Sequence, residues 1–183
     1  MKSKIAVATL MALSLSSVGA FAAAPTGADS GQVTFNGEVV DSPCSLAPGQ
    51  DGTDVKVDFG QLSMSQLNAG VETTEPFSLH LENCSLLKDP KDPTKGSLVA
   101  SIAFNSMDAS SDPLLMTTRG SASGLGIGIK GFSVDGTVTP LKGLATTGNN
   151  ELKFTAIAKK AVAATDVTAG DFEAATNFQI TYN

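Results

Sequence analysis

The sequence contains few of the residues that enzymes use most often for catalysis. Its 183 residues include one histidine, His80, and two cysteines, Cys44 and Cys84. A serine or cysteine nucleophile needs a base, usually histidine, and His80 lies on the polar face of a predicted strand, where we expect it to face solvent. The sequence has no HExxH motif, EF-hand spacing or phosphate-binding glycine loop. These absences argue against enzymatic activity, and we expect no metal and no cofactor.

Three further features resemble functional motifs only superficially. The glycines of Gly124–Gly128 alternate with apolar residues and no predicted helix follows them, so they indicate a strand with one bare face. Nothing places the carboxylates of Glu72 and Glu75 around a pocket, so we expect them to be solvated. The pair Lys159–Lys160 fits an exposed strand end better than a basic contact patch.

The sequence also lacks a hydrophobic run long enough to cross a bilayer, which takes about 20 apolar residues. The apolar run Ile5–Leu15 is shorter, follows two lysines, and precedes the small residues Ala20-Phe21-Ala22. This pattern predicts a signal peptide over residues 1–22, cleaved after Ala22 or after one of the next two alanines. We therefore expect an exported chain that is not inserted directly into a membrane.

Basic residues are scarce. The chain has 12 Lys and Arg against 18 Asp and Glu, a formal net charge of −6. Loss of the predicted leader, with its two lysines, leaves ~160 residues with a net charge of about −8. That length suits one domain with its own hydrophobic core. An acidic surface argues against nucleic acid or anionic membrane as a partner.

The two cysteines can be interpreted in two ways. Export to an oxidising compartment favours a disulfide between Cys44 and Cys84. The alternative, a two-thiol metal or redox site, lacks CxxC spacing and has only one histidine to assist it. A disulfide would close a loop of about 40 residues, which the chain-entropy model values at roughly 4 kcal/mol.

Apolar and polar residues alternate along most of the remaining sequence, which is the pattern of half-buried strands. The alternating segments are 33–39, 55–59, 77–81, 98–104, 125–129, 152–158 and 178–182. Eight or nine short strands, separated by Gly, Pro, Asn and Asp, predict an all-β fold. The expected packing is a two-sheet sandwich of immunoglobulin type.

The segments between the strands allow more local predictions. Residues Gln61–Asn68 could form one or two helical turns anchored by Leu62 and Leu67. Residues Val134–Val138 predict a hairpin around Asp-Gly, and Gly148–Asn150 predicts a turn. The charged segment Lys88–Gly96, with its two prolines, predicts an exposed loop.

The first alternating segment, Gly31–Asp41, leaves one question open. Its apolar face carries Val33, Phe35 and Val39, and Gly37 leaves a gap in that face. A glycine inside a strand often marks a place where another backbone or side chain approaches closely. The pattern alone fits an ordinary first strand of its own domain as well as an arm that pairs with another molecule. The last alternating segment could likewise be an ordinary final strand.

Several motifs, in this order, resemble the pilins of the chaperone–usher pathway, most closely the major shaft subunits of P-pilus and type 1-like fimbriae. The first is Val39-Val40-Asp41-Ser42-Pro43-Cys44, and the second is Val55-Lys56-Val57-Asp58-Phe59-Gly60-Gln61-Leu62. A second cysteine follows about 40 residues after the first, and the aromatic Tyr182 stands one place from the end. The resemblance covers the mature chain, although residues 86–147 carry little of the pattern.

The resemblance implies an immunoglobulin-like sandwich that lacks its final strand. In that family a groove runs along the sheet edge beside the C-terminal strand. A chaperone strand fills it in the periplasm, and the N-terminal arm of the next subunit replaces that strand in the fibre. By this resemblance, residues 23–41 are the donor-strand arm and residues 42–183 are the pilin domain.

The resemblance also implies roles for individual residues. The donor strand would present its apolar face, with Gly37 facing a shallow pocket of the neighbour. The acceptor groove would be lined by the C-terminal strand, and the terminal carboxylate would bind basic groups of the chaperone. The donor residues are Gly31, Val33, Phe35, Gly37 and Val39; the acceptor and chaperone-contact residues are Phe178, Ile180, Tyr182 and Asn183.

The expected function is therefore that of a structural subunit of an adhesive fimbria that polymerises by donor-strand exchange. The expected partners are a periplasmic chaperone, an outer-membrane usher, other copies of the chain and other pilins. The chain would pass through the periplasm and end in the extracellular fimbria. One alternative is a minor adaptor or tip-associated subunit of the same fimbria. Another, a secreted enzyme on a sandwich scaffold, lacks a base and a pocket.

Overall fold

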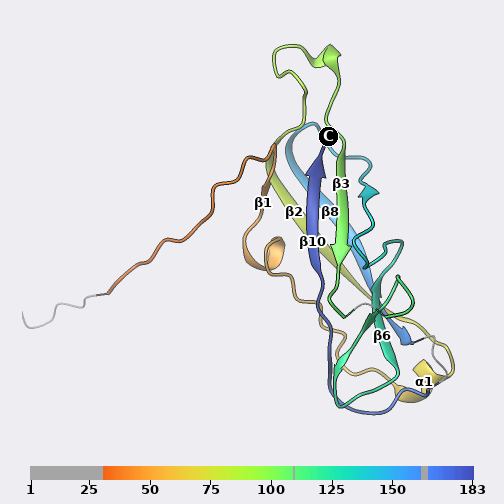
Figure 1. Ribbon diagram of the computed structural model, residues 1–183. Coiled ribbons are helices and arrows are strands. Elements are labelled where there is room, and N and C mark those ends of the chain that lie inside the picture. Colours follow the sequence, from red (N-terminus) through yellow and green to blue (C-terminus); the bar gives the residue numbers. More distant parts are fainter. Residues whose placement is uncertain (1–30, 109, 162–164) are drawn as a thin grey trace, which may run out of the picture. The chain divides into compact units, whose positions relative to one another are not determined.

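The computed structural model describes residues 31–108, 110–161 and 165–183 (Figure 1), so the predicted signal peptide lies outside the described residues. The described chain is mostly β-sheet, which confirms the predicted all-β class. The strands are β1 (Ser45–Leu46), β2 (Thr73–Ser85), β3 (Ala100–Asn105), β4 (Met116–Thr117), β5 (Arg119–Gly120), β6 (Leu125–Ile129), β7 (Thr139–Pro140), β8 (Thr147–Lys160), β9 (Phe172–Glu173) and β10 (Asn177–Tyr182). The helices are α1 (Met64–Asn68) and two 3-10 turns, Gly49–Asp51 and Pro93–Lys95.

Residues Val40–Asn183 form one compact unit, a domain separate from the preceding residues. Its largest sheet has the strand order β1-β2-β8-β6-β4, and a second sheet has the order β10-β3-β7. The strands β5 and β9 form a small additional pair. All of these pairings are antiparallel.

The hydrophobic core joins residues of both larger sheets, as expected for a sandwich. Phe104 of β3 is 2% exposed and packs edge-on against Phe154 of β8, with ring centroids 5.5 Å apart. Its ring also contacts Phe132 at 5.5 Å and Phe178 of β10 at 6.3 Å. Leu79 of β2 is 1% exposed in the same cluster. The alternation predicted from the sequence therefore corresponds to the core faces of these strands.

The predicted bare face of β6 exists, but another part of the chain covers it. Ile127 points into the core, so Gly126 and Gly128 lie on the opposite face of the strand. Leu115, which is fully buried, packs over these glycines. A Cβ atom at Gly128 would lie 2.3 Å from the backbone oxygen of Leu114. Glycine at this position thus allows the Leu114–Leu115 backbone to cross the sheet in close contact.

We expect Gly128→Ala to lower the free energy of unfolding by about 3 kcal/mol, because backbone must move to admit the methyl group. Gly126→Ala is the matched comparison, since its Cβ would meet only the side chain of Leu115, at 2.9 Å. The free energy of unfolding of Gly126→Ala should fall by about 1 kcal/mol, since a side chain adapts more easily than backbone. Urea unfolding of the two oxidised variants measures both values. Equal losses would contradict this account of the close approach.

The predicted hairpin over Val134–Val138 is wrong. The Asp135 carboxylate accepts a hydrogen bond from the Thr137 amide at 3.0 Å, which closes a local side-chain turn. The backbone then follows β3, where the Gly136 amide donates to the Phe104 carbonyl at 2.8 Å. Val134 is fully buried, whereas Val138 is 59% exposed. The Asp-Gly pair therefore forms a bend beside an existing strand.

The predicted turn at Gly148–Asn150 is also wrong, because these residues belong to β8. The register between β2 and β8 shifts between Leu81 and Cys84, opposite this part of β8. Gly148 adopts a φ of +83°, which glycine tolerates. The bulge itself lies in β2, because Glu82 and Asn83 stand opposite Asn149 alone, and the turn-like residues form the part of β8 that faces it.

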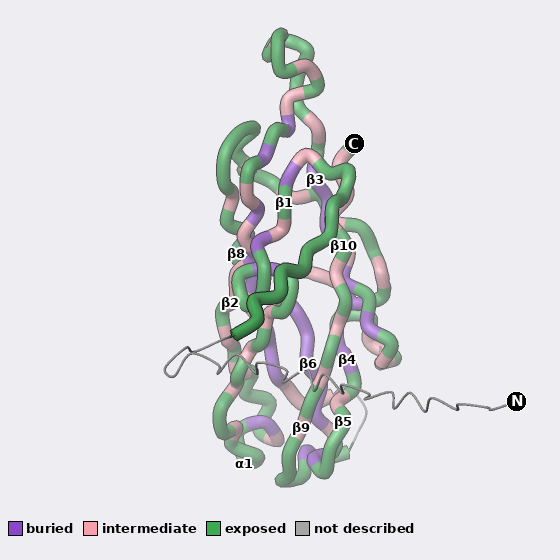
Figure 2. Tube along the Cα trace, turned by 90° about the vertical axis from the view of Figure 1, so that its left-hand side faces the viewer, coloured by how far each residue is buried: buried purple, intermediate pink, exposed green. Residues whose placement is uncertain are grey.

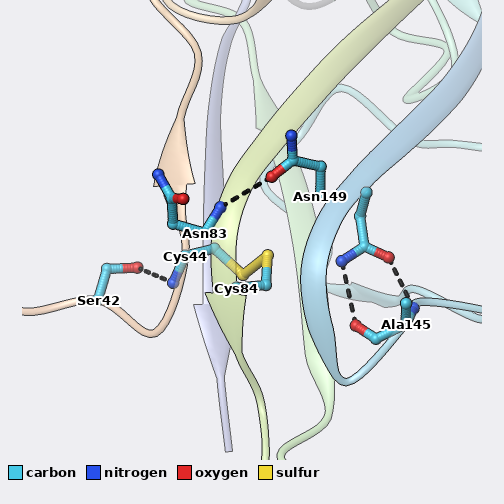
Figure 3. Close-up of a disulfide and its surroundings, with 7 residues drawn as sticks. Ser42, Cys44, Asn83, Cys84, Ala145 and Asn149 are labelled. Carbon is cyan, nitrogen blue, oxygen red and sulfur yellow. Dashed lines mark hydrogen bonds between the residues drawn. A yellow bond between two sulfur atoms is a disulfide. The ribbon is translucent and has the colours of Figure 1, made fainter.

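The predicted disulfide between Cys44 and Cys84 is present (Figure 3). It joins the chain just before β1 to the end of β2, and both cysteines are 4% exposed. The Ser42 hydroxyl accepts a hydrogen bond from the Cys44 amide at 3.4 Å, and the Asn83 amide donates to the Asn149 side chain at 3.1 Å. The disulfide thus fixes the start of the domain against its largest sheet.

Candidate functional site: an apolar groove between two unpaired edges

The domain contains a groove of about 780 Å³. It lies between the segment Thr53–Phe59 and the segment Phe172–Phe178, which includes β9 and the start of β10. Its floor consists of apolar core side chains from both sheets: Leu46, Phe77, Leu79, Phe104, Met116, Ile127 and Ile129. In Figure 2, β6 is buried (purple), whereas β10 alternates between intermediate (pink) and exposed (green) at its start. The groove therefore opens onto the hydrophobic core.

One wall of the groove includes the start of β10, where Asn177 and Phe178 line it, whereas the predicted acceptor residues Ile180, Tyr182 and Asn183 lie beyond the lining. This strand pairs with β3, with Phe178 opposite Phe104 and Ile180 opposite Ile102. Phe178, Ile180 and Tyr182 are partly buried and pack against the core. β10 is the edge strand of its sheet, and no other described strand pairs with its outer edge. An edge of this kind presents unpaired N–H and C=O groups to any strand that can add to it.

The other wall is the segment Val55–Phe59, which the sequence predicted as a strand. The side chains alternate as predicted, with Val55, Val57 and Phe59 partly buried and Lys56 and Asp58 exposed. However, the segment is not in a ladder, and its backbone makes no hydrogen bond to the backbone of another described residue. It is therefore an extended segment without a partner strand on the groove side.

The N-terminal arm has the complementary pattern. Among the described residues, 31–41 form no strand or helix. Val33 is 75% exposed, Phe35 is 89% exposed and Val39 is 100% exposed. No atom lies within 4 Å of the position that a Cβ atom would take at Gly31 or Gly37. An exposed row of large apolar side chains of this kind indicates a segment that binds a partner.

The end of the chain contacts both the segment before β3 and the start of the domain. The backbones of Val99 and Asn183 exchange hydrogen bonds of 2.7 and 3.0 Å. Tyr182 lies beside Ser42, where the arm joins the domain; half-burial raises the pKa of the Tyr182 hydroxyl, and the Ser42 hydroxyl acts in the opposite direction. The arm therefore leaves the domain at the end where β10 finishes.

The other residues considered from the sequence are not brought together into a site. His80 lies opposite Glu151 on β2 and β8, and Lys160 pairs with Asp166 at 2.6 Å. In residues 31–108, 110–161 and 165–183, no cluster of three or more His, Cys, Asp or Glu could hold a metal ion. No helix of the described chain is long and apolar enough to cross a membrane.

Sequence reasoning predicted strands at the floor residues Phe77, Leu79, Phe104, Ile127 and Ile129 without assigning them to a groove, and it missed Leu46, Met116 and Phe172. Leu46 and Met116 belong to strands of two residues, which are too short to show a period, and Phe172 stands alone between acidic residues. Only the burial of Val55, Val57 and Phe59 beside β10 identifies these residues as parts of one surface.

A sandwich whose edge strand and a second unpaired segment border an apolar groove has the geometry to accept an added strand. Comparison with known proteins identifies the family. The sequence model described as "Fimbrial protein" matches residues 33–183, and the chain belongs to this family.

Individual relatives agree with this assignment. The chain is 37% identical to the Pap fimbrial major pilin protein of Escherichia coli, over 98% of both chains. It is 34% identical to the Fimbria A protein of Serratia marcescens, over 98% of this chain and 97% of the relative.

Solved structures give the same result. A chaperone–usher pilus whose structure addresses rod uncoiling matches with a TM-score of 0.69 and 34% identity, over 85% of this chain and 96% of the other. The P pilus rod subunit PapA matches with a TM-score of 0.66 and 29% identity, over 78% of this chain and all of PapA. The chain has the immunoglobulin-like pilin fold. It is a structural subunit of an extracellular pilus that assembles with other pilin subunits, and it is not an enzyme. Nothing in these comparisons favours a minor adaptor or tip-associated subunit.

Proposed function

We propose that this pilin polymerises by donor-strand exchange, with residues 23–41 of one subunit entering the groove of the next. The single observation that carries the proposal is the groove itself, which exposes an apolar floor between two unpaired edges. An added strand would pair with both edges and place every second side chain on the floor. The arm of the same chain supplies such side chains at Val33, Phe35 and Val39.

The direction of the inserted arm follows from where the arm leaves its own domain. Asp41 stays close to the end of its domain at which β10 finishes, since Ser42 lies beside Tyr182. In an open filament, unlike ends of neighbouring subunits must meet. Asp41 of one subunit therefore lies near Asn177 of the next, and the arm runs antiparallel to β10.

The same groove explains the need for further partners. Before assembly, its unpaired edges and apolar floor would promote aggregation. We infer that a periplasmic chaperone covers the groove with its own strand and that an outer-membrane usher exchanges this strand for the arm. In this scheme the signal peptide of residues 1–22 exports the chain to the periplasm. The carboxylate of Asn183, at the end of β10, would bind basic groups of the chaperone.

The experiment that tests the proposal compares the oxidised mature chain with a chain that lacks residues 23–41. The mature chain should form fibres visible by electron microscopy. The shortened chain should form none, because it has a groove but no arm. It should nevertheless bind a peptide of residues Gly31–Asp41, which supplies the missing strand. Fibres from the shortened chain, or failure of both chains to bind the peptide, would refute donor-strand exchange.

A further inference from the structure

We propose that Gln50 is a positioning residue that holds the wall Val55–Phe59 extended and ready to accept the arm. Its side-chain amide makes two hydrogen bonds to the backbone of one residue of the wall. Its Oε1 accepts from the Lys56 amide at 2.5 Å, and its Nε2 donates to the Lys56 carbonyl at 3.3 Å. A primary amide has the same donor and acceptor as a peptide unit, so it can replace one step of a β ladder. This inference rests on the proposed donor-strand exchange.

The position of Gln50 leaves the groove side of the wall free. In an extended chain, successive residues direct their backbone groups to opposite edges. Gln50 binds the backbone N–H and C=O groups of Lys56, and Gln50 is not among the residues that line the groove. Val55, Lys56 and Val57 all line the groove, and the N–H and C=O groups of Val55 and Val57 therefore lie at the edge opposite the one that Gln50 occupies. They make no backbone hydrogen bond to another described residue.

The loop that carries Gln50 is itself fixed to the largest sheet. The Ala47 amide donates to the His80 carbonyl of β2 at 2.9 Å, and the Asp54 amide donates to the Gly49 carbonyl at 2.7 Å. Gly52 is buried, and a Cβ atom there would lie 2.2 Å from the Ala47 carbonyl oxygen. Gln50 thus connects a fixed loop to a segment that has no ladder of its own. Without this connection, the wall would have to be ordered at the moment the arm binds.

The test measures binding of a labelled peptide of residues Gly31–Asp41 to the oxidised, full-length mature chain. Every chain in this comparison also carries Gly37→Asn, which disables its own arm in the proposed exchange and leaves its groove free for the peptide. Gln50→Ala should slow association roughly tenfold, because two hydrogen bonds that order the free wall are lost. Dissociation should change little, since the bound peptide then holds the wall. Gln61→Ala, another exposed glutamine with no side-chain hydrogen bond to a described residue, should behave as the chain with Gln50 intact.

A second variant and a second readout separate positioning from general stability. Gln50→Glu keeps the acceptor for the Lys56 amide but cannot donate to the Lys56 carbonyl, so its association rate should be intermediate. The Lys56 amide should exchange with solvent faster in Gln50→Ala than in the chain with Gln50 intact. Unchanged association in both variants, or faster dissociation alone, would overturn the role of Gln50. If the chain with Gln50 intact does not bind the peptide, the proposed function fails together with this inference.

Discussion

Cells that express the Gly37→Asn variant should assemble almost no fibres, although the variant subunit folds. The substitution puts a polar side chain on the apolar face of the arm, between Phe35 and Val39. In the groove of a neighbour this side chain would meet a closely fitted surface and would lose its hydrogen bonds to water. Each of these effects costs about 1 to 3 kcal/mol, and together they weaken insertion roughly 100-fold or more.

The fold of the variant should not change, because no atom lies within 4 Å of a Cβ at Gly37. Electron microscopy of fibres and thermal melting of the purified subunit measure the two properties separately. Glu38→Asn is the matched control, since it puts the same side chain at the next position, on the polar face of the arm. That control should polymerise normally. Normal fibres from Gly37→Asn would remove Gly37 from the donor strand.

We expect the opposite defect from Val57→Asp, which places a carboxylate on the wall of the groove. The free subunit tolerates this charge, since Val57 is only partly buried. Insertion of an arm would remove the carboxylate from water without a partner, which costs at least several kcal/mol. The variant should therefore donate its arm normally but accept none, and fibre growth should stop.

Val138→Asp is the matched control for this prediction. Val138 is 59% exposed beside β7, and it does not line the groove. The same substitution there should leave fibre length unchanged, as measured by electron microscopy. If both aspartate variants stop growth, the effect is one of added charge. If neither does, the segment Val55–Phe59 is not a wall of the acceptor site.

The sequence predicted the two alternating segments that border the groove, but it did not predict that they enclose a groove. The alternation of Phe178, Ile180 and Tyr182 identified β10, because one face of that strand is buried and the other is not. The same alternation at Val55–Phe59 predicted a strand where the structure has an unpaired extended segment. Alternation of apolar and polar residues indicates which side chains are buried. It carries no information on whether the backbone is hydrogen-bonded to a neighbouring strand.

The errors in the fold have a common physical origin. Asp135-Gly136 and Gly148–Asn150 carry the residues of turns, but these residues also suit a bend beside β3 and the part of β8 that faces a bulge in β2. The cover over β6 depends on Leu115, which precedes a two-residue strand and follows irregular chain. Gln50 was missed for a similar reason, because an exposed glutamine in a loop gives no sequence signal. Contacts with distant strands decided the cases of β3, β8 and β6, whereas Gln50 acts on a residue only six places away.

Mixing the two defective variants tests the central claim most directly. The arm of Val57→Asp is intact and the groove of Gly37→Asn is intact, so one productive insertion remains possible. We predict that each variant alone stays monomeric and that the equimolar mixture forms a one-to-one complex that grows no further. Mass measurement by light scattering after size-exclusion chromatography detects that complex. A mixture that remains monomeric would contradict insertion of the arm of one subunit into the groove of another.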